Sequence, residues 1–553
     1  MQWVYSAVAP LIFPLAFWNR VTVYYREISH KECGEVMMIR CKYLRPLLLL
    51  LLLVAAVLSF SACSSNSDAA TSIWVVTEET DEDGMNQQVR QVIKAFQADH
   101  PDVTVTLDIL PTDSSQREIV LKQMRTKIIA GKGPDVYLLP SCNTYRYATK
   151  YWAAQEAWTL PTQVEPLFLD PSQVMRRGAF LDISRFYDSD TELKTEELQP
   201  DVMEAGTLDG GRYLLPLRYD FPVLYADAEG LQSLGLELDG SWGNLADAAL
   251  ALGSPVFANG AKPDFCQLGS VLTLLPAALD YEHDAVTLTE EDLLSFLTRY
   301  SALLTLSDGH HDEYYGPNLF RWIHHGTLKI SPSDLANPAA VNNAEKIEWE
   351  IFPRDVSIIV GTMSQAPIAA TIMQAEEKEL LMIPLTDDNG KLTADVTYYG
   401  ALGAGCRNPE LGYDLLRRFL LEENQWEQNR TLQRNVVNQK LLMQYHPIAN
   451  GWPVRNHGWL EGWWGYVRNS IYKSQSIMDG DDIRSKKLRL VELTDDDIPI
   501  LDAKIDRVSF GNTVEQEIAT LLRQLRDGEA GDEDLEAQAA QFLRELRWQI
   551  TEG

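Results

Sequence analysis

Residues 126–143 read Thr-Lys-Ile-Ile-Ala-Gly-Lys-Gly-Pro-Asp-Val-Tyr-Leu-Leu-Pro-Ser-Cys-Asn. A helix is expected to end at Gly131, because glycine accepts the left-handed conformation that closes a helix and the following proline cannot continue one. Residues 135–139 are typical of a short buried strand, apolar after its first residue. A helix, a sharp turn and such a strand make half of a parallel α/β unit, in which ligands bind just beyond the carboxyl ends of the strands. The pattern therefore places Ser141 and Asn143 where a ligand would bind.

The segments before this unit continue the same alternation. Residues 73–76 and 103–109 have the apolar pattern of strands, and residues 85–98 and about 115–130 have apolar side chains at helical spacing. Strand, helix, strand, helix and strand within about seventy residues predict a parallel sheet with crossover helices.

Two amphipathic helices are expected at the end of the chain, and their short apolar faces are typical of packing on a core. The first has a capping box predicted from Thr513 and Gln516. The apolar faces consist of Val514, Ile518, Leu521, Leu522 and Leu525, and of Leu535, Ala539, Phe542 and Leu546.

Length and charge limit the possible functions. A chain of 553 residues can form several domains. Its net charge is −31, and the acidic excess lies after residue 62, because the segment before it carries more Lys and Arg than Asp and Glu. Such a surface repels nucleic acid and anionic membranes, so neither is an expected partner. No Cys-x-x-Cys pair occurs among the six cysteines, which argues against a zinc ribbon or a thioredoxin-like site.

The N-terminal region has the features of a secretory signal. Residues 47–58 are an unbroken apolar run that follows Arg40, Lys42 and Arg45 and is too short for a comfortable membrane span. Cys63 follows small residues, which resembles the bacterial lipoprotein signal, in which that cysteine is acylated. A plain cleaved signal or an uncleaved anchor are the alternatives. The boundaries predicted are an upstream extension at 1–36, a lipoprotein signal at 37–62 and a tether at 63–71.

The motifs of common enzyme classes are absent from the sequence. There is no Gly-x-Ser-x-Gly, no P-loop and no His-Glu-x-x-His, so we expect no catalytic residues, no cofactor and no enzyme. Several polar clusters were weighed as metal sites, and the expected role of each is a polar surface segment. These clusters are His310-His311 with Asp312 and Glu313, His324-His325, residues 479–482 and residues 495–497.

A series of short blocks resembles the extracellular solute-binding proteins of family 1, which serve carbohydrate ABC importers. The resemblance lies in the order and spacing of the blocks and covers about residues 72–553. The blocks are Ala130-Gly-Lys-Gly-Pro-Asp-Val136, Gly178-Ala-Phe-Leu-Asp-Ile-Ser184, Asp209-Gly-Gly-Arg-Tyr-Leu-Leu-Pro216, Val223-Leu-Tyr225, Gly235-Leu236 with Ser241-Trp242, Leu381-Met-Ile-Pro384, and residues 396–421.

The resemblance implies an α/β fold of two lobes, the type II periplasmic-binding-protein-like fold, with the ligand cleft between the lobes. The N-terminal lobe would comprise residues 72–217 and 403–450, and the C-terminal lobe residues 218–402 and 451–553. The chain would cross between lobes near residues 216–219, 400–405 and 448–454.

Sugar recognition needs aromatic faces for stacking and buried polar groups for the hydroxyls. Asp220 is the foremost candidate, with a hinge hydrogen bond as its alternative role. For the tyrosines the alternative is a place in a core strand, and for the tryptophans helix packing. Trp242 is expected to be structural, and Ala226 stands where the family often has asparagine. The ligand-binding residues implied are Ser141, Asn143, Tyr219, Asp220, Thr362, Ser364, Tyr398, Tyr399, Trp463 and Trp464.

The function implied is that of a lipid-anchored extracellular protein that captures a carbohydrate and delivers it to an ABC importer. The partners would be a carbohydrate ligand, the importer's permease subunits and the membrane through the Cys63 anchor, with the protein a monomer. The alternatives are a sensor lipoprotein of the same fold that reports to a membrane receptor, and a polysaccharide-degrading lipoprotein enzyme. The identity of the ligand, the true start codon and the state of Cys142, Cys266 and Cys406 stay open at this level.

Overall fold

The structure is a computed structural model of the chain. Residues 1–70, which include the predicted extension, signal and Cys63, lie outside its described residues. In the part that is described, no helix combines the length and the apolar character needed to cross a membrane. The described residues are 71–78, 85–111, 113–141, 165–235, 237–252, 272–280, 285–307, 358–363, 366, 379–421, 452–455, 498–527 and 535–552.

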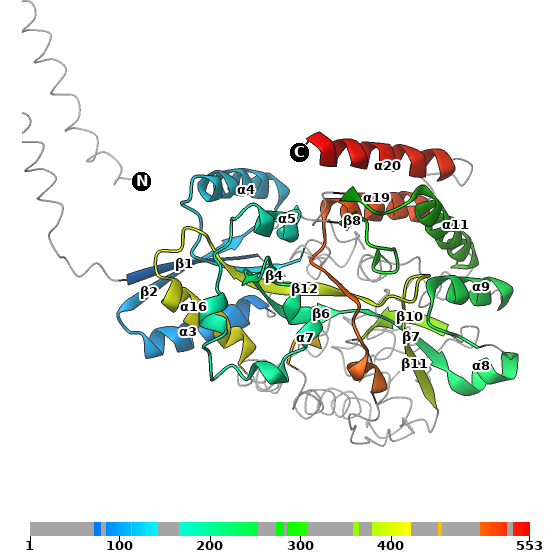
Figure 1. The fold of residues 1–553 in the computed structure, drawn as a ribbon, viewed down its shortest axis with the longest axis horizontal. Coiled ribbons are helices and arrows are strands. Elements are labelled where there is room, and N and C mark those ends of the chain that lie inside the picture. The colour runs from blue at the N-terminus through cyan, green and yellow to red at the C-terminus, as the bar shows by residue number, and fades with distance from the viewer. Residues whose placement is uncertain are drawn as a thin grey trace, which may run out of the picture. The chain divides into compact units, whose positions relative to one another are not determined.

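A mixed sheet of seven strands forms the larger of the described sheets (Figure 1). Its neighbour order is β13-β6-β12-β3-β1-β2, and β14 pairs with β12. The strands are β1 (Thr71–Glu78), β2 (Val103–Leu110), β3 (Val136–Pro140), β6 (Leu214–Asp220), β12 (Thr393–Leu402), β13 (Trp452–Pro453) and β14 (Arg507–Ser509).

The parallel α/β unit predicted from the sequence is confirmed. Strand β1 pairs in parallel with both β2 and β3. Helix α3 (Met85–Asp99) connects β1 to β2, and helix α4 (Ser114–Ile129) connects β2 to β3. The apolar faces expected for these elements are buried, with Val89 and Phe96 of α3 fully covered. Burial of a strand on both faces explains its nearly continuous apolar sequence.

The turn between α4 and β3 is fixed by its backbone contacts. Gly131 has φ of 65°, the conformation expected where the helix ends. Asp135 then accepts hydrogen bonds from the backbone N–H groups of Trp74 (2.8 Å) and Arg407 (3.1 Å). A Cβ atom on Gly403 would lie 2.3 Å from the carbonyl oxygen of Pro134. Two segments far apart in sequence therefore meet here backbone against backbone.

The centre of the sheet is built from β6 and β12. Strand β12 is antiparallel to β3 on one side and to β6 on the other, so β6 runs parallel to β3. The prediction had assigned residues 393–402 and 452–453 to the C-terminal lobe, and this is corrected by the pairing. Strand β12 is hydrogen-bonded on both edges inside the larger sheet, and β13 extends the same sheet through β6.

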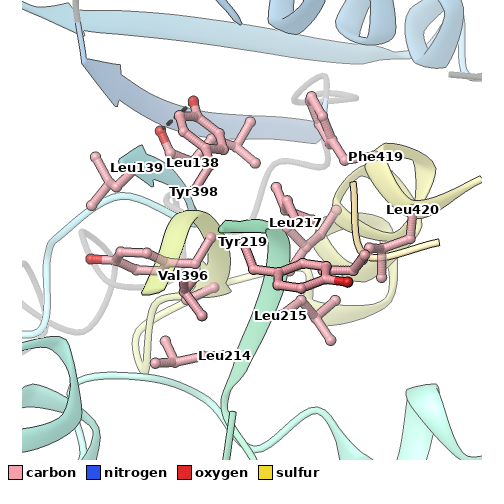
Figure 2. Packing of buried hydrophobic residues seen from close by; sticks show 14 of the residues in the cluster. Leu138, Leu139, Leu214, Leu215, Leu217, Tyr219, Val396, Tyr398, Phe419 and Leu420 are labelled. Carbon is pink, nitrogen blue, oxygen red and sulfur yellow. Dashed lines mark hydrogen bonds between the residues drawn. The ribbon is translucent and has the colours of Figure 1, made fainter. Parts of the chain in front are cut away.

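The first core lies on this sheet, and Figure 2 shows part of it. It includes Val76, Phe96, Leu138, Leu215 and Leu416. Other elements that contribute to this part of the chain are α5 (Pro171–Arg176), α6 (Ser184–Tyr187), α7 (Pro200–Glu204), α16 (Pro409–Arg417), the 3-10 turns at Thr195–Glu197, Arg418–Leu420 and Pro499–Asp502, and the hairpin of β4 (Thr207–Leu208) with β5 (Gly211–Arg212).

A separate second core includes Leu224, Trp242, Leu297, Leu385 and Leu522. Helix α11 contacts α9, α19 and α20 (Figure 1). The helices of this core are α8 (Ala228–Leu234), α9 (Trp242–Leu252), α11 (Glu290–Ser307), α19 (Thr513–Asp527) and α20 (Leu535–Glu552), and β8 (Leu279–Asp280) pairs with β9 (Ala285–Val286) beside them.

A three-stranded antiparallel sheet contributes to both cores. It has the order β10 (Ile358–Thr362), β7 (Pro222–Asp227) and β11 (Leu380–Pro384). In β7, Val223 and Tyr225 belong to the first core, whereas Leu224 and Ala226 belong to the second. Successive side chains of a strand point to opposite faces, so each face of this small sheet covers a different core. Two cores agree with the two-lobed α/β architecture that the sequence predicted.

Within the described residues, the chain passes between the cores at three places. The first is Asp220–Pro222, close to the crossing predicted at residues 216–219. The second lies between Leu385 of the second core and Leu392 of the first, and the third between Phe510 and Val514. Of the crossings predicted at 400–405 and 448–454, residues 400–402 and 452–453 pair inside the larger sheet and do not cross between the cores. Residues 448–451 lie outside the described residues.

The N-terminus of α19 also differs from its prediction by one residue. Asn512 is the cap, since its Oδ1 accepts from the backbone N–H of Glu515 at 2.9 Å. The Glu515 carboxylate in turn accepts from Asn512 Nδ2 and from Ser509 Oγ. The box predicted from Thr513 and Gln516 is therefore shifted, because asparagine is as good a cap as threonine and tertiary contacts chose the earlier residue.

Candidate functional site

Three strand ends of the larger sheet meet at one edge. Strands β1, β3 and β6 run in the same direction, so their carboxyl ends lie together. Ser141 follows β3, and its backbone N–H donates to Thr397 O at 3.1 Å. Asp220 ends β6 and lies opposite Asp395 of β12 in the strand register. Ligands of open α/β sheets bind beyond such an edge, which makes it the candidate site.

The pair of aspartates at this edge is buried. Asp220 is 9% exposed and Asp395 is 8% exposed. The Asp220 carboxylate accepts from the backbone N–H of Phe221 at 3.0 Å, which fixes the start of the first crossing. This hydrogen bond matches the hinge role considered for Asp220, and its ligand contact stays a prediction. Like charges that face each other across a ladder destabilise it unless other groups compensate them.

Arg218 supplies a positive charge on the same strand. Residues 218 and 220 project from one face of β6, because side chains two apart in a strand share a face. Arg218 is 7% exposed, and burial lowers the pKa of its guanidinium to about 10. Sequence reasoning missed Arg218 and Asp395. The signal available was a charged residue at an inward position of an otherwise apolar strand, in Leu-Pro-Leu-Arg-Tyr-Asp and in Thr-Ala-Asp-Val.

The end of β1 carries a buried ion pair that sequence reasoning also missed. Glu78 and Arg117 lie 2.6 Å apart and their side chains are at most 3% exposed. Arg117 also donates to the carbonyl oxygens of Glu165 and Pro111, at 2.6 and 2.8 Å. These bonds tie the first turn of α4 to the end of β1 and to the chain that returns at residue 165. The pair therefore stabilises the carboxyl end of β1.

The three described tyrosines among the candidates lie in the first core. Tyr398 is 2% exposed, and its hydroxyl donates to Leu138 O at 3.0 Å and lies 2.9 Å from Thr77 Oγ1 (Figure 2). Tyr399 packs edge-on against Phe510 at 5.6 Å between ring centroids. Tyr219 is 2% exposed, and its burial raises the pKa of the phenol well above its usual range. The core role weighed for Tyr398 and Tyr399 is the one that the structure describes, and Tyr219 shares it.

Thr362 lies beside the first crossing. It ends β10 opposite Pro222, and its carbonyl oxygen accepts from the hydroxyl of Tyr225 at 2.6 Å. Thr362 therefore lies opposite a residue two positions after Asp220, at the start of the small sheet. Ala226 is fully buried in the second core, where it offers no polar contact. The candidates outside the described residues are Asn143, Ser364, Trp463 and Trp464, as are the His and Asp clusters weighed as metal sites.

One family model matches part of the chain. Residues 81–256 match the family model described as bacterial extracellular solute-binding protein. None of the curated proteins matches the chain.

Among solved structures, the chain is similar to a family 1 extracellular solute-binding protein from Alicyclobacillus acidocaldarius, at 12% identity and TM-score 0.43, covering 88% of this chain and 100% of that one. It is similar to the galacto-N-biose/lacto-N-biose I-binding protein of an ABC transporter from Bifidobacterium longum, at 14% identity and TM-score 0.45, covering 88% and 99%. It is also similar to the GacH receptor of Streptomyces glaucescens, at 14% identity and TM-score 0.43, covering 86% and 98%.

The matched segment runs from the helix after β1 through the first crossing to the end of α9, and it contains Ser141 and Asp220. Residues 130–136, Ala-Gly-Lys-Gly-Pro-Asp-Val, also lie inside the matched segment. The proteins of this family are described as extracellular solute-binding proteins. Over residues 81–256, the chain is similar to the bacterial extracellular solute-binding protein family.

Proposed function

We propose that the protein captures a carbohydrate outside the cell and delivers it to an ABC importer. The observation that carries the proposal is the edge of the larger sheet at the first crossing, where Ser141, Arg218, Asp220 and Asp395 come together in strand register. A ligand bound there would contact both the end of a strand in the larger sheet and the first crossing, which could act as a hinge. Hinge closure around the guest would then follow from its tighter binding to the closed state.

An uncharged polyhydroxyl ligand fits the chemistry of these side chains. Carboxylates accept hydrogen bonds from hydroxyls, and a guanidinium donates several in a fixed plane. Their burial makes the choice of ligand strict, because an analogue that lacks a hydroxyl leaves a buried polar group unpaired. Both signs of charge occur at the edge, which suits a neutral guest better than a strongly charged one.

Titration calorimetry on the mature chain against a broad glycan panel tests the proposal. The panel includes lacto-N-biose and acarbose, which are named with the similar solved structures. We expect at least one glycan to bind with a Kd of about 1 μM or tighter, near 8 kcal/mol of binding free energy. Absence of binding across the panel would refute the proposal that the ligand is a carbohydrate.

The lipid anchor and the importer are separate parts of the proposal. They are supported by the Cys63 motif and by the extracellular setting of the family. Metabolic labelling with palmitate should mark the wild type and leave Cys63→Ala unlabelled. Loss of glycan uptake in a strain lacking the protein, with growth on unrelated sugars unchanged, would support delivery to an importer.

The protein is proposed to have no enzymatic activity and to act as a monomer. Incubation of labelled oligosaccharide should return it intact, and appearance of shorter products would establish the polysaccharide-degrading alternative. Normal uptake together with a lost transcriptional response to the glycan would instead establish the sensor alternative.

A further inference from the structure

The turn that carries the second crossing has two adjacent aspartates. It connects β11 to β12 and contains Asp387, Asp388 and Gly390. The Asp387 carboxylate accepts from the backbone N–H groups of Asn389 and Lys391, both at 2.9 Å. Gly390 has φ of 70°, and its N–H donates to Asp387 O at 2.9 Å. The turn is therefore closed by its own hydrogen bonds.

One side of the turn is bound to the second core. Asp388 accepts from the backbone N–H of Gly243, in the first turn of α9, at 2.7 Å. Its other oxygen lies 2.5 Å from Arg299 Nη1 on α11. The preceding residue, Thr386, exchanges backbone hydrogen bonds with Gly240 and Trp242. A carboxylate at a helix N-terminus is also favoured by the helix dipole.

The other side of the turn is bound to the larger sheet. Asp387 is 1% exposed, and its Oδ2 accepts from Arg507 Nη2 of β14 at 2.8 Å. The backbone of Leu392 bonds with Asp506 on the same segment, through Leu392 N to Asp506 Oδ2 at 3.2 Å. Strand β14 pairs with β12, so these contacts continue into the sheet of the first core.

The two ion pairs differ in environment. Asp387 and Arg507 are 1% and 24% exposed in their side chains, whereas Asp388 and Arg299 are 46% and 28% exposed. Separation of the buried pair leaves a buried charge without a partner, which costs free energy. The charges of the exposed pair can instead be solvated by water when they separate. Arg507 Nη2 also donates to Leu275 O of the second core, at 3.4 Å. A rotation of one core relative to the other would therefore open the Asp388–Arg299 contact and this longer bond before the buried pair.

We propose that Asp388 and Arg299 form a latch that holds the resting orientation of the two cores, with Asp387 and Arg507 as its fixed side. Only the biological role of the latch rests on the proposed function. That role would be to set how readily the protein closes around its ligand. Its existence as a mechanical coupling is independent of any ligand.

Hydrogen exchange of the ligand-free protein tests the latch in the variants Arg299→Gln and Asp388→Asn. Both should speed amide exchange by about fivefold in peptides covering the other two crossings, residues 219–222 and 509–513, as for loss of a contact near 1 kcal/mol. None of the substituted side chains contacts those peptides in the interactions described above. Arg299→Lys keeps the charge and should restore most of the protection.

The matched controls are Arg125→Gln and Glu165→Gln. That pair spans 2.6 Å against 2.5 Å in the latch, with side chains 34% and 49% exposed, but it lies outside the crossings. Exchange confined to residues 240–244 and 386–391, or equal changes in the controls, would overturn the latch. Glycan binding by the wild type is measured separately, so a failed sugar panel with a positive exchange result refutes the proposed function and leaves the latch standing.

Discussion

Asp220 and Tyr398 show that polar side chains on adjoining strands have different tasks. The Tyr398 hydroxyl bonds within the core to Leu138 O, and the ring is almost fully buried. The Asp220 carboxylate lies at the end of its strand, where the chain leaves the sheet. Both residues were candidates for ligand contact in the sequence, with Asp220 the foremost, and the structure separates them further by the depth of their polar groups.

Tyr398→Phe and Asp220→Asn should therefore have opposite effects. We expect Tyr398→Phe to lower the free energy of unfolding by about 1–2 kcal/mol, because Leu138 O and Thr77 lose a buried partner. Its glycan affinity should equal that of the wild type. Asp220→Asn should weaken glycan binding by about tenfold or more, since a charged acceptor is lost. Chemical denaturation and calorimetry measure the two quantities, and reduced affinity in Tyr398→Phe would refute its core role.

Asp414 is the centre of a charged network between α3 and α16. It lies 2.9 Å from His100 Nε2, 2.9 Å from Arg417 Nε and 3.2 Å from Arg418 Nη2. Burial alone would raise the pKa of Asp414, but the His100 hydrogen bond and the two arginines outweigh it and hold the pKa below its usual value of 3.8. A depressed pKa means that the ionised form stabilises the fold.

The lowered pKa of Asp414 makes the free energy of unfolding depend on pH. The stabilisation by Asp414 is fully present above pH 3.8 and is lost as the pH falls through the lower pKa of the folded state. Asp414→Asn should cost about 1–2 kcal/mol at pH 5, and the deficit relative to wild type should shrink toward pH 3. Urea melts at each pH measure this, and a deficit that grows on acidification would contradict the assignment.

At the level of elements, the contact between the α4–β3 turn and the end of β12 leaves no room for a side chain. Gly403→Ala would place a methyl 2.3 Å from Pro134 O, and backbone cannot move aside as a flexible side chain can. We expect a loss of about 2–3 kcal/mol of unfolding free energy. Ala404→Ser, at the exposed neighbouring position, should change it by less than about 0.5 kcal/mol. Equal melting temperatures for the two variants would mean that the turn and the strand end do not touch.

The N-cap of α19 can be tested by substitution at Asn512 and Thr513. Asn512→Ala should destabilise the protein by about 1 kcal/mol, because the Glu515 N–H and carboxylate both lose a partner. Thr513→Ala, at the position that the sequence alone favoured, should have a smaller effect. Thermal melts of both variants decide between the two caps, and a larger loss in Thr513→Ala would restore the original assignment.

For the whole molecule, two cores imply two regions of local stability. Leu297 of α11 and Leu416 of α16 are both fully buried, one in each core. Leu297→Ala and Leu416→Ala should each cost about 2–5 kcal/mol, as cavities do. Native-state hydrogen exchange should rise mainly in α9, α11, α19 and α20 for the first variant, and mainly in β1, β3 and β12 for the second. Uniform loss of protection in both would indicate a single cooperative core.

The sequence by itself determined the parallel α/β unit, the two terminal helices and the resemblance to solute-binding proteins. These depend on local periodicity and on turn residues such as Gly131, whose effects act over a few neighbours. It also placed Trp242 correctly as a structural residue, which packs on Phe296 at 5.4 Å.

Tertiary structure alone decided which sheet took β12 and β13, where the second and third crossings lie, and which polar residues reach the carboxyl edge. An apolar strand pairs equally well with several neighbours, so its sheet is set by partners distant in sequence. Tyr398 entered the core and Asp395 came opposite Asp220 for the same reason: the register of β12 between β3 and β6 fixes both, and no local pattern encodes that register.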